Sequence, residues 1–145
     1  MAFDIEALIP HRPPFLWVDR IVSLDQEKIV AEKDLAANLE LYQGHYPQYP
    51  ITPGVILCEA VFQAGALLIG HGLKEAGQEV AGVPVLTRIY SAKFKRQVPP
   101  GSTITLEARL LEKVGMAWLM KGKVKLDGKT AVSVEFACAE SAGEV

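Results

Sequence analysis

Apolar and polar residues alternate strictly in two segments of the second half of the chain. The apolar positions are Ile104, Leu106, Ala108 and Leu110 in 103–111, and Val132, Val134, Phe136 and Cys138 in 130–138. A period of two residues places these side chains on one face of a strand. The pattern therefore predicts two strands, each with one face toward a core.

A different pattern covers residues 54–70, where apolar residues surround every face of a helix. Only Glu59 and Gln63 interrupt this pattern. Apolar residues on every face are typical of a helix enclosed on most sides. A membrane span is the alternative, but the segment is short for one, and a charge at bilayer depth costs about 3 kcal/mol on insertion scales. We expect the buried helix of a soluble protein and no membrane span.

The remaining elements follow from turn residues and changes of period. The expected elements are a short helix at 4–9, strands at 17–23 and 28–35 joined by the turn 24–27, a proline-punctuated loop up to Pro53, a polar connection at 74–82, a strand at 92–97, and turns at 99–102 and 126–129. Asp127-Gly128 is a strong two-residue hairpin signal.

One long apolar helix with five or six mostly antiparallel strands indicates an α+β fold in which a sheet wraps a helix. At 145 residues the chain suits one domain, 1–145. One helix cannot cover both faces of such a sheet, so we expect a dimer to complete the burial.

The amino-acid composition disfavours several classes of function. The chain is 50% hydrophobic and 22% charged with a net charge of -2, which disfavours disorder and broad nucleic-acid binding. Cys58 and Cys138 have neither metal-ligand spacing nor the density of a disulfide scaffold, so we interpret both as buried free thiols in a reducing compartment. The acidic, proline-containing N-terminus does not resemble a signal peptide. We expect a cytoplasmic protein without a metal.

Candidate chemistry gathers in "GHYPQYPITPGVILCEAVFQ", residues 44–63. Pro47, Pro50 and Pro53 each fix one backbone angle, so the loop that carries His45 is stiff, as a positioned catalytic side chain requires. A rigid surface connection that merely contains a histidine is the alternative.

The start of the long helix is a candidate binding site for a substrate oxygen. Thr52 is a plausible N-cap with Pro53 in the first turn. The N–H groups of Gly54 and Val55 would then lack intrahelical acceptors, and the missing side chain of Gly54 would admit a substrate oxygen. The alternative is an ordinary helix start.

Glu59 and Gln63 lie one turn apart on one face of this helix. Apolar neighbours favour the protonated form of a carboxyl group, which makes Glu59 a candidate general acid that Gln63 could orient. A structural Glu–Gln pair is the alternative. A base, an acid and an oxyanion site without a nucleophile suit proton removal beside a thioester carbonyl with loss of a β-hydroxyl.

The order and spacing of four motifs resemble the (3R)-3-hydroxyacyl-acyl-carrier-protein dehydratases of type II fatty-acid synthesis. The motifs are "IPHRPPFLWVDRI", "GHYPQYPITPGVILCEAVFQAG", "AKFKRQVPPGS" and "GKVKLDGKTAV", which span nearly the whole chain. The most specific feature is a His followed by Pro-Gly-Val, a Glu fourteen residues after the His and a Gln four residues further.

The resemblance implies a hotdog fold and a homodimer with one continuous sheet, in some members a trimer of dimers, and no cofactor. His45 of one subunit would take the carbon-2 proton, Glu59 of the other would protonate the leaving hydroxyl, and Gly54 would hold the thioester oxygen. The implied partner is acyl carrier protein, received by basic residues that we match to Lys93, Lys95 and Arg96. A solvated strand that its lysines protect against edge pairing is the alternative.

Two residues depart from the family's "GHFPG" pattern, since Tyr46 replaces Phe and Gln48 replaces Gly. A hydratase or thioesterase acting on coenzyme A thioesters, and a non-catalytic acyl-binding subunit, remain alternatives. His11 and Arg12 match the family's His-Arg pair and are interpreted as structural or docking residues, and His71 as a residue of the helix end. Chain length, carrier and pathway stay open.

Overall fold

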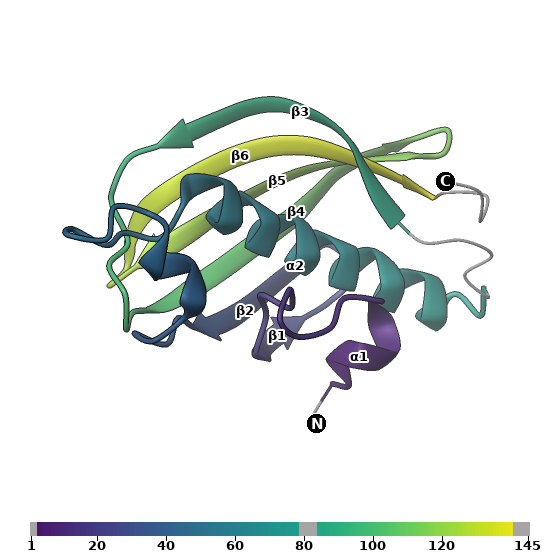
Figure 1. The fold of residues 1–145 in the computed structure, drawn as a ribbon. Helices are drawn as coiled ribbons and strands as arrows, with labels where there is room; N and C mark the ends of the chain where they lie inside the picture. The colour runs from purple at the N-terminus through teal and green to yellow at the C-terminus, as the bar shows by residue number, and fades with distance from the viewer. Residues whose placement is uncertain (1–2, 79–83, 141–145) are drawn as a thin grey trace.

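The computed structural model describes residues 3–78 and 84–140, which form one sheet around one long helix (Figure 1). The helices are α1 Ile5–Leu8, a 3₁₀ turn at Glu40–Gln43 and α2 Gly54–Glu75. The strands are β1 Arg20–Leu24, β2 Lys28–Asp34, β3 Pro84–Phe94, β4 Thr103–Val114, β5 Ala117–Leu126 and β6 Lys129–Glu140.

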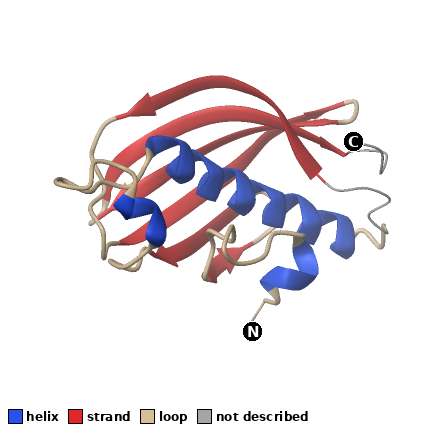
Figure 2. Cartoon of the chain, viewed as in Figure 1, coloured by secondary structure: helices blue, strands red, loops and turns tan. Residues whose placement is uncertain are grey.

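All pairs of neighbouring strands are antiparallel, in the order β1-β2-β4-β5-β6-β3. The sheet curves around α2, which lies along its concave face, while α1 packs against α2 (Figures 1 and 2). The predicted α+β class and the sheet wrapped on a helix are confirmed.

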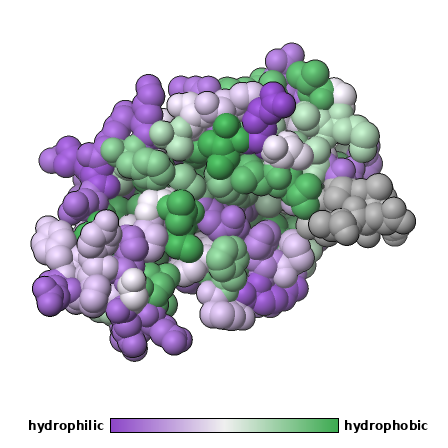
Figure 3. Space-filling model, turned by 45° about the horizontal axis from the view of Figure 1, so that its top comes forward, coloured by the Kyte–Doolittle hydropathy of each residue, from purple (hydrophilic) through white to green (hydrophobic). Residues whose placement is uncertain are grey.

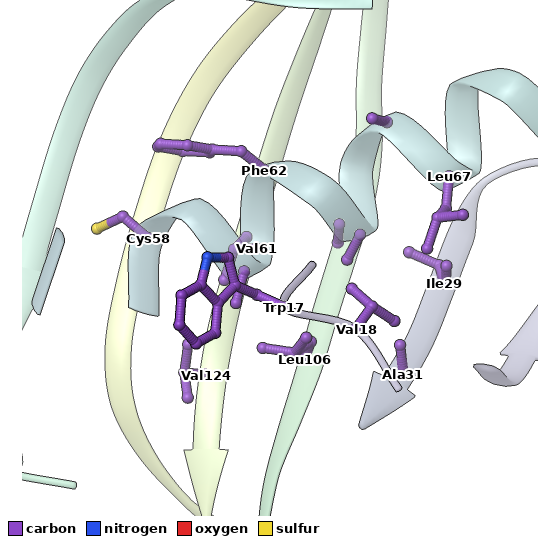
Figure 4. Packing of buried hydrophobic residues seen from close by; sticks show 14 of the residues in the cluster. Trp17, Val18, Ile29, Ala31, Cys58, Val61, Phe62, Leu67, Leu106 and Val124 are labelled. Atoms are coloured by element: carbon purple, nitrogen blue, oxygen red, sulfur yellow. The ribbon is translucent and has the colours of Figure 1, made fainter. Parts of the chain in front are cut away.

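The core fills the space between α2 and the sheet. Figure 4 shows Val61 and Leu67 of α2 with Ile29 and Leu106 of the strands in this layer, and all four side chains are buried. By length and composition α2 could cross a membrane, but 72% of its apolar window is buried inside the structure, as in the core helix of a soluble protein. The all-round apolar pattern therefore indicates enclosure by protein.

Element boundaries differ from the predictions where packing overrides the local pattern. The predicted first strand includes Trp17 and Val18, but β1 begins at Arg20, and these two side chains instead lie buried beneath α2 (Figure 4). The helix predicted over 54–70 continues to Glu75. The polar connection predicted at 74–82 falls partly on residues 79–83, which lie outside the described residues.

The Asp127-Gly128 hairpin is confirmed. Both residues have positive φ, 52° and 77°, and Leu126 pairs with Lys129 across the turn. Two residues with φ > 0 are what a type I′ turn requires, and its twist matches that of the flanking strands.

The edge strand β3 exposes apolar side chains. Leu86, Ile89, Tyr90 and Phe94 are 41 to 56% exposed, although one edge of β3 pairs with β6. Figure 3, turned so that the top of the molecule comes forward, shows apolar side chains gathered on this face. An exposed apolar edge strand is prone to pair with another chain.

Close packing between α2 and β5 predicts opposite effects for two glycines. A Cβ at Gly122 would lie 2.4 Å from Val61 Cγ1 and 2.6 Å from the Glu107 carbonyl oxygen. We expect Gly122→Ala to lower the free energy of unfolding by about 1–3 kcal/mol, because backbone atoms cannot move aside easily. Denaturant unfolding followed by circular dichroism measures the change.

The matched control is Gly72→Ala, since a Cβ at Gly72 meets nothing within 4 Å. Helix propensity should raise the free energy of unfolding by up to about 1 kcal/mol there. Equal effects of the two substitutions would contradict the packing described at Gly122.

Candidate active site

His45 lies in the loop between the 3₁₀ turn and α2, with a half-buried ring fixed by one hydrogen bond. Its Nδ1 is 2.9 Å from the Ile51 carbonyl oxygen. A carbonyl oxygen can only accept, so Nδ1 carries the proton in this contact and Nε2 of the neutral ring keeps a free lone pair. The arrangement leaves Nε2 able to remove a proton from a substrate.

The stiffness of this loop has more sources than its prolines. Tyr46 has a positive φ of 51°, and its ring meets the His45 ring edge-on at 4.8 Å between centroids. The hydroxyls of Tyr42 and Thr52 are 2.7 Å apart, and both side chains are buried. The hydrogen bond between Tyr42 and Thr52 therefore connects the two ends of the loop that carries His45.

The predicted cap of α2 is wrong by one residue. The N-cap is Pro53, whose carbonyl oxygen accepts from the N–H groups of Ile56 and Leu57 at 3.0 and 3.2 Å. Thr52 does not cap the helix, because its hydroxyl is bonded to Tyr42 instead.

The N–H groups of Gly54 and Val55 are the first two of α2. Within residues 3–78 and 84–140 neither has a hydrogen-bond acceptor. A Cβ built on Gly54 would lie 2.6 Å from Cε1 of the Phe94 ring, so the ring rests directly on this glycine. The helix start thus presents two unpaired donors beside an aromatic ring, and such donors can stabilise a developing oxyanion.

Glu59 lies further along α2 and is held by Gln63. The Gln63 Nε2 donates to Glu59 Oε2 at 2.9 Å, and the Glu59 side chain is 26% exposed. The apolar run predicts a more enclosed carboxyl group than this single chain provides. The predicted contact between Glu59 and Gln63 is present.

Gln63 is only 1% exposed, and besides Glu59 its side chain bonds two backbone groups that are distant in the sequence. Its Nε2 also donates to the Phe15 carbonyl oxygen at 2.9 Å, and its Oε1 accepts from the Trp17 N–H at 2.7 Å. Residues 15 and 17 are more than forty positions away in the sequence, so no spacing rule could have found them. The N-terminal segment therefore holds the Gln63 side chain in place, and Gln63 in turn holds Glu59.

His45 and Glu59 are not joined to each other within one chain. The polar contacts of His45 and Glu59 run to Ile51, Gln63 and His11. This separation is compatible with a site completed by a second copy.

Both cysteines are buried free thiols, as predicted. Burial raises the pKa of the Cys58 thiol, and burial together with the Glu59 charge raises the pKa of Cys138 to about 12. Neither thiol is suited to nucleophilic attack near neutral pH. Within the described part of the chain no three His, Cys, Asp or Glu side chains are grouped to hold a metal ion.

The basic residues Lys93, Lys95 and Arg96 are all exposed. Lys93 belongs to β3, whereas Lys95 and Arg96 follow its end. None of the ion pairs formed among the described residues includes them. They flank or follow Phe94, whose ring contacts Gly54, so the backbone that carries them passes close to the start of α2.

Arg12 and His71 have structural contacts. The Arg12 guanidinium donates to the carbonyl oxygens of Glu6, Ile9 and His11 and pairs with the Glu6 carboxylate at 2.8 Å. The His71 ring meets Phe3 edge-on at 5.7 Å between centroids. His11 instead approaches Glu59, a proximity that sequence reasoning missed.

Comparison with known proteins places these residues in context. A family model described as FabA-like domain matches residues 9–135. The 3-hydroxyacyl-[acyl-carrier-protein] dehydratase FabZ of Anaeromyxobacter sp. (strain K) is 40% identical over 134 residues, covering 91% of this chain and 85% of that protein. The FabZ of Ruminiclostridium cellulolyticum is 42% identical over 135 residues, 91% of each chain.

Solved structures agree on the fold. A chain of "The Dehydratase Heterocomplex ApeI:P from Xenorhabdus doucetiae" superposes with a TM-score of 0.81 at 14% identity, over 97% of this chain and 93% of that one. A hypothetical thioesterase from Streptococcus pneumoniae solved with coenzyme A gives a TM-score of 0.65 at 11% identity, over 87 and 88% of the two chains. At these identities the likeness establishes the hotdog fold alone.

The network around Gln63 predicts a stability effect at the candidate site. We expect Gln63→Leu to lower the free energy of unfolding by about 2–4 kcal/mol, because a buried N–H at Trp17 and a partly buried carbonyl at Phe15 lose their partner. Urea unfolding measures the loss. Gln43→Leu, at an exposed position, is the control and should change stability by about 0.5 kcal/mol or less. A loss at Gln63 no larger than at Gln43 would rule out the anchoring role.

Proposed function

This chain belongs to the FabA-like domain family, and we propose on that premise that it converts (3R)-3-hydroxyacyl thioesters of acyl carrier protein to trans-2-enoyl thioesters. It is an enzyme of the hydro-lyase type, related over 91% of its length to 3-hydroxyacyl-[acyl-carrier-protein] dehydratases. The reaction belongs to fatty-acid biosynthesis, and we place it in the cytoplasm.

The observation that carries the assignment of roles is the His45 hydrogen bond. Because Nδ1 faces the Ile51 carbonyl oxygen at 2.9 Å, Nε2 is the nitrogen free to act as base. In the proposed step Nε2 takes the proton from carbon 2 of the substrate, and the electrons of that C–H bond move toward the thioester carbonyl.

The charge that develops on the thioester oxygen is stabilised by the free N–H groups of Gly54 and Val55. Glu59 then delivers its proton to the 3-hydroxyl as the carbon–oxygen bond breaks. The carbon 2–carbon 3 double bond forms and water leaves, so atoms and charge balance without a further reactant. Gln63 holds Glu59 in place through its 2.9 Å hydrogen bond.

We propose that the complete site forms in a homodimer, with His45 and Glu59 from different subunits. The lack of a polar contact between His45 and Glu59 within one chain supports this arrangement, as does the exposed apolar edge of β3. Pairing of two β3 edges would join the sheets and cover these side chains. A trimer of such dimers is the further assembly we propose.

We propose that acyl carrier protein docks on Lys93, Lys95 and Arg96. Lys95 lines two surface hollows of about 450 and 470 Å³, the first of which also contains Arg109 and Lys121. The chain as a whole carries a net charge of -2, so this concentration of cations is local. Free cations attract an acidic partner and speed its association.

Two substitutions test the catalytic roles. We expect His45→Ala and Glu59→Gln each to lower kcat by about a hundredfold to ten-thousandfold, because each removes a proton-transfer group. Ultraviolet absorbance follows enoyl-thioester formation and hydration on carrier-protein and coenzyme A substrates. Size-exclusion chromatography confirms that each variant still assembles.

An inactive, folded wild-type protein on both carriers would overturn the proposal and favour an acyl-binding subunit. Release of free thiol would instead indicate a thioesterase, and preference for coenzyme A a hydratase.

Charge reversal tests carrier docking. We expect the double variant Lys95→Glu, Arg96→Glu to raise KM for carrier-linked substrate about tenfold at low salt and less at high salt, with kcat unchanged. Coenzyme-A-linked turnover should be unaffected. Lys74→Glu, about 30 Å along α2 from its start, is the control. An equal rise in KM for both carriers would refute docking at these residues.

A further inference from the structure

His11, interpreted from the sequence as a structural or docking residue, lies beside the candidate general acid. Its Nε2 is 3.7 Å from Glu59 Oε2, and the two side chains are 25 and 26% exposed. This distance is too long for a hydrogen bond but within the range of direct electrostatic contact. The same oxygen accepts from Gln63 Nε2 at 2.9 Å. Both nitrogens therefore face one oxygen of the carboxyl group.

The backbone around His11 is held from both sides. Arg12 Nη1 donates to the carbonyl oxygens of Ile9 at 2.8 Å and His11 at 2.7 Å. A few residues later the Phe15 carbonyl oxygen accepts from Gln63 at 2.9 Å. Gln63 thus fixes both Glu59 and the segment that carries His11.

The environment of the His11 ring favours one tautomer. Its Nδ1 is buried without a hydrogen-bond partner among the described residues. A proton on Nδ1 would be a buried, unpaired donor, whereas an unpaired acceptor nitrogen costs less. The neutral ring therefore carries its proton on Nε2, the nitrogen that faces Glu59.

We propose that His11 is a positioning residue for Glu59: its Nε2–H, 3.7 Å from Oε2, adds an electrostatic attraction to the Gln63 hydrogen bond that makes Oε2 the accepting oxygen. Oε1 has no hydrogen bond to a described residue, and it is the oxygen that carries the proton for the substrate 3-hydroxyl. The inference rests on the proposed role of Glu59 as general acid and adds a second residue, beside Gln63, that favours Oε1 as the donating oxygen.

Two titratable groups of the described chain are placed near Glu59, and the proposed dimer adds the partner's His45, which is unchanged in the variants below. His11 faces Glu59 from the N-terminal segment, and Cys138 feels its charge from β6. The pKa of Cys138 is raised to about 12, first by burial and then by Glu59, so this thiol stays neutral near pH 7. A change in Glu59 titration on replacing His11 is therefore attributable to His11.

The test replaces His11 with Met, which removes the donor, and with Gln, which returns an N–H near the Nε2 position. We expect His11→Met to lower kcat about tenfold with KM changed less than about twofold, and His11→Gln to recover most of the loss. The alkaline limb of the pH–rate profile should move to higher pH in His11→Met, because a donor that stabilises the carboxylate is lost. His71→Met is the matched control and should leave the profile unchanged.

Carbon-13 NMR titration of Glu59, assigned with Glu59→Gln, gives a readout that does not depend on turnover. The midpoint for Glu59 should rise in His11→Met and return in His11→Gln. An unchanged midpoint, or equal losses in His11→Met and His11→Gln, would overturn the proposal. If wild type shows no dehydration, the proposed function fails, while the NMR titration still decides whether His11 acts on Glu59.

Discussion

The enclosure of one amide, that of Gln63, is the constraint on which the rest of the site depends. A polar side chain only 1% exposed in an apolar helix must find partners, since each unsatisfied buried group costs about 1–3 kcal/mol. Gln63 finds them in the Phe15 carbonyl oxygen and the Trp17 N–H, and it uses its remaining hydrogen for Glu59. One side chain therefore couples the packing of the N-terminal segment to the geometry of the reacting carboxyl group.

The sheet supplies the enclosure that makes this coupling strong. Because α2 is apolar on all faces, the sheet must curve around it, and Trp17 and Val18 fill the remaining space beneath it (Figure 4). The start of α2 escapes this enclosure and leaves Gly54 and Val55 with free N–H groups. The same packing buries the side chains along α2 and leaves the N–H groups of its first turn without acceptors.

Catalysis in such a site requires a base and an acid whose proton positions are defined before substrate arrives. The backbone carbonyl of Ile51 defines the free nitrogen of His45, and the hydrogen bond from Gln63 distinguishes the two oxygens of Glu59. The orientation of His45 and that of Glu59 each depend on a hydrogen bond to a neutral group, the Ile51 carbonyl and the Gln63 amide, rather than on an ion pair. The exposed cations at the end of β3 are instead the part of the surface suited to electrostatic attraction of a partner.

The sequence by itself determined the fold class and predicted the set of candidate catalytic residues. Strict alternation in β4 and β6 and the all-round apolar run of α2 reflect burial directly, so they could be interpreted without coordinates. Only the tertiary structure decided the cap at Pro53, the position of Trp17 outside β1, and the contacts of Gln63 and His11 with distant segments. These depend on which segments meet in space, and residues 11 and 59 meet only because the chain folds back along α2.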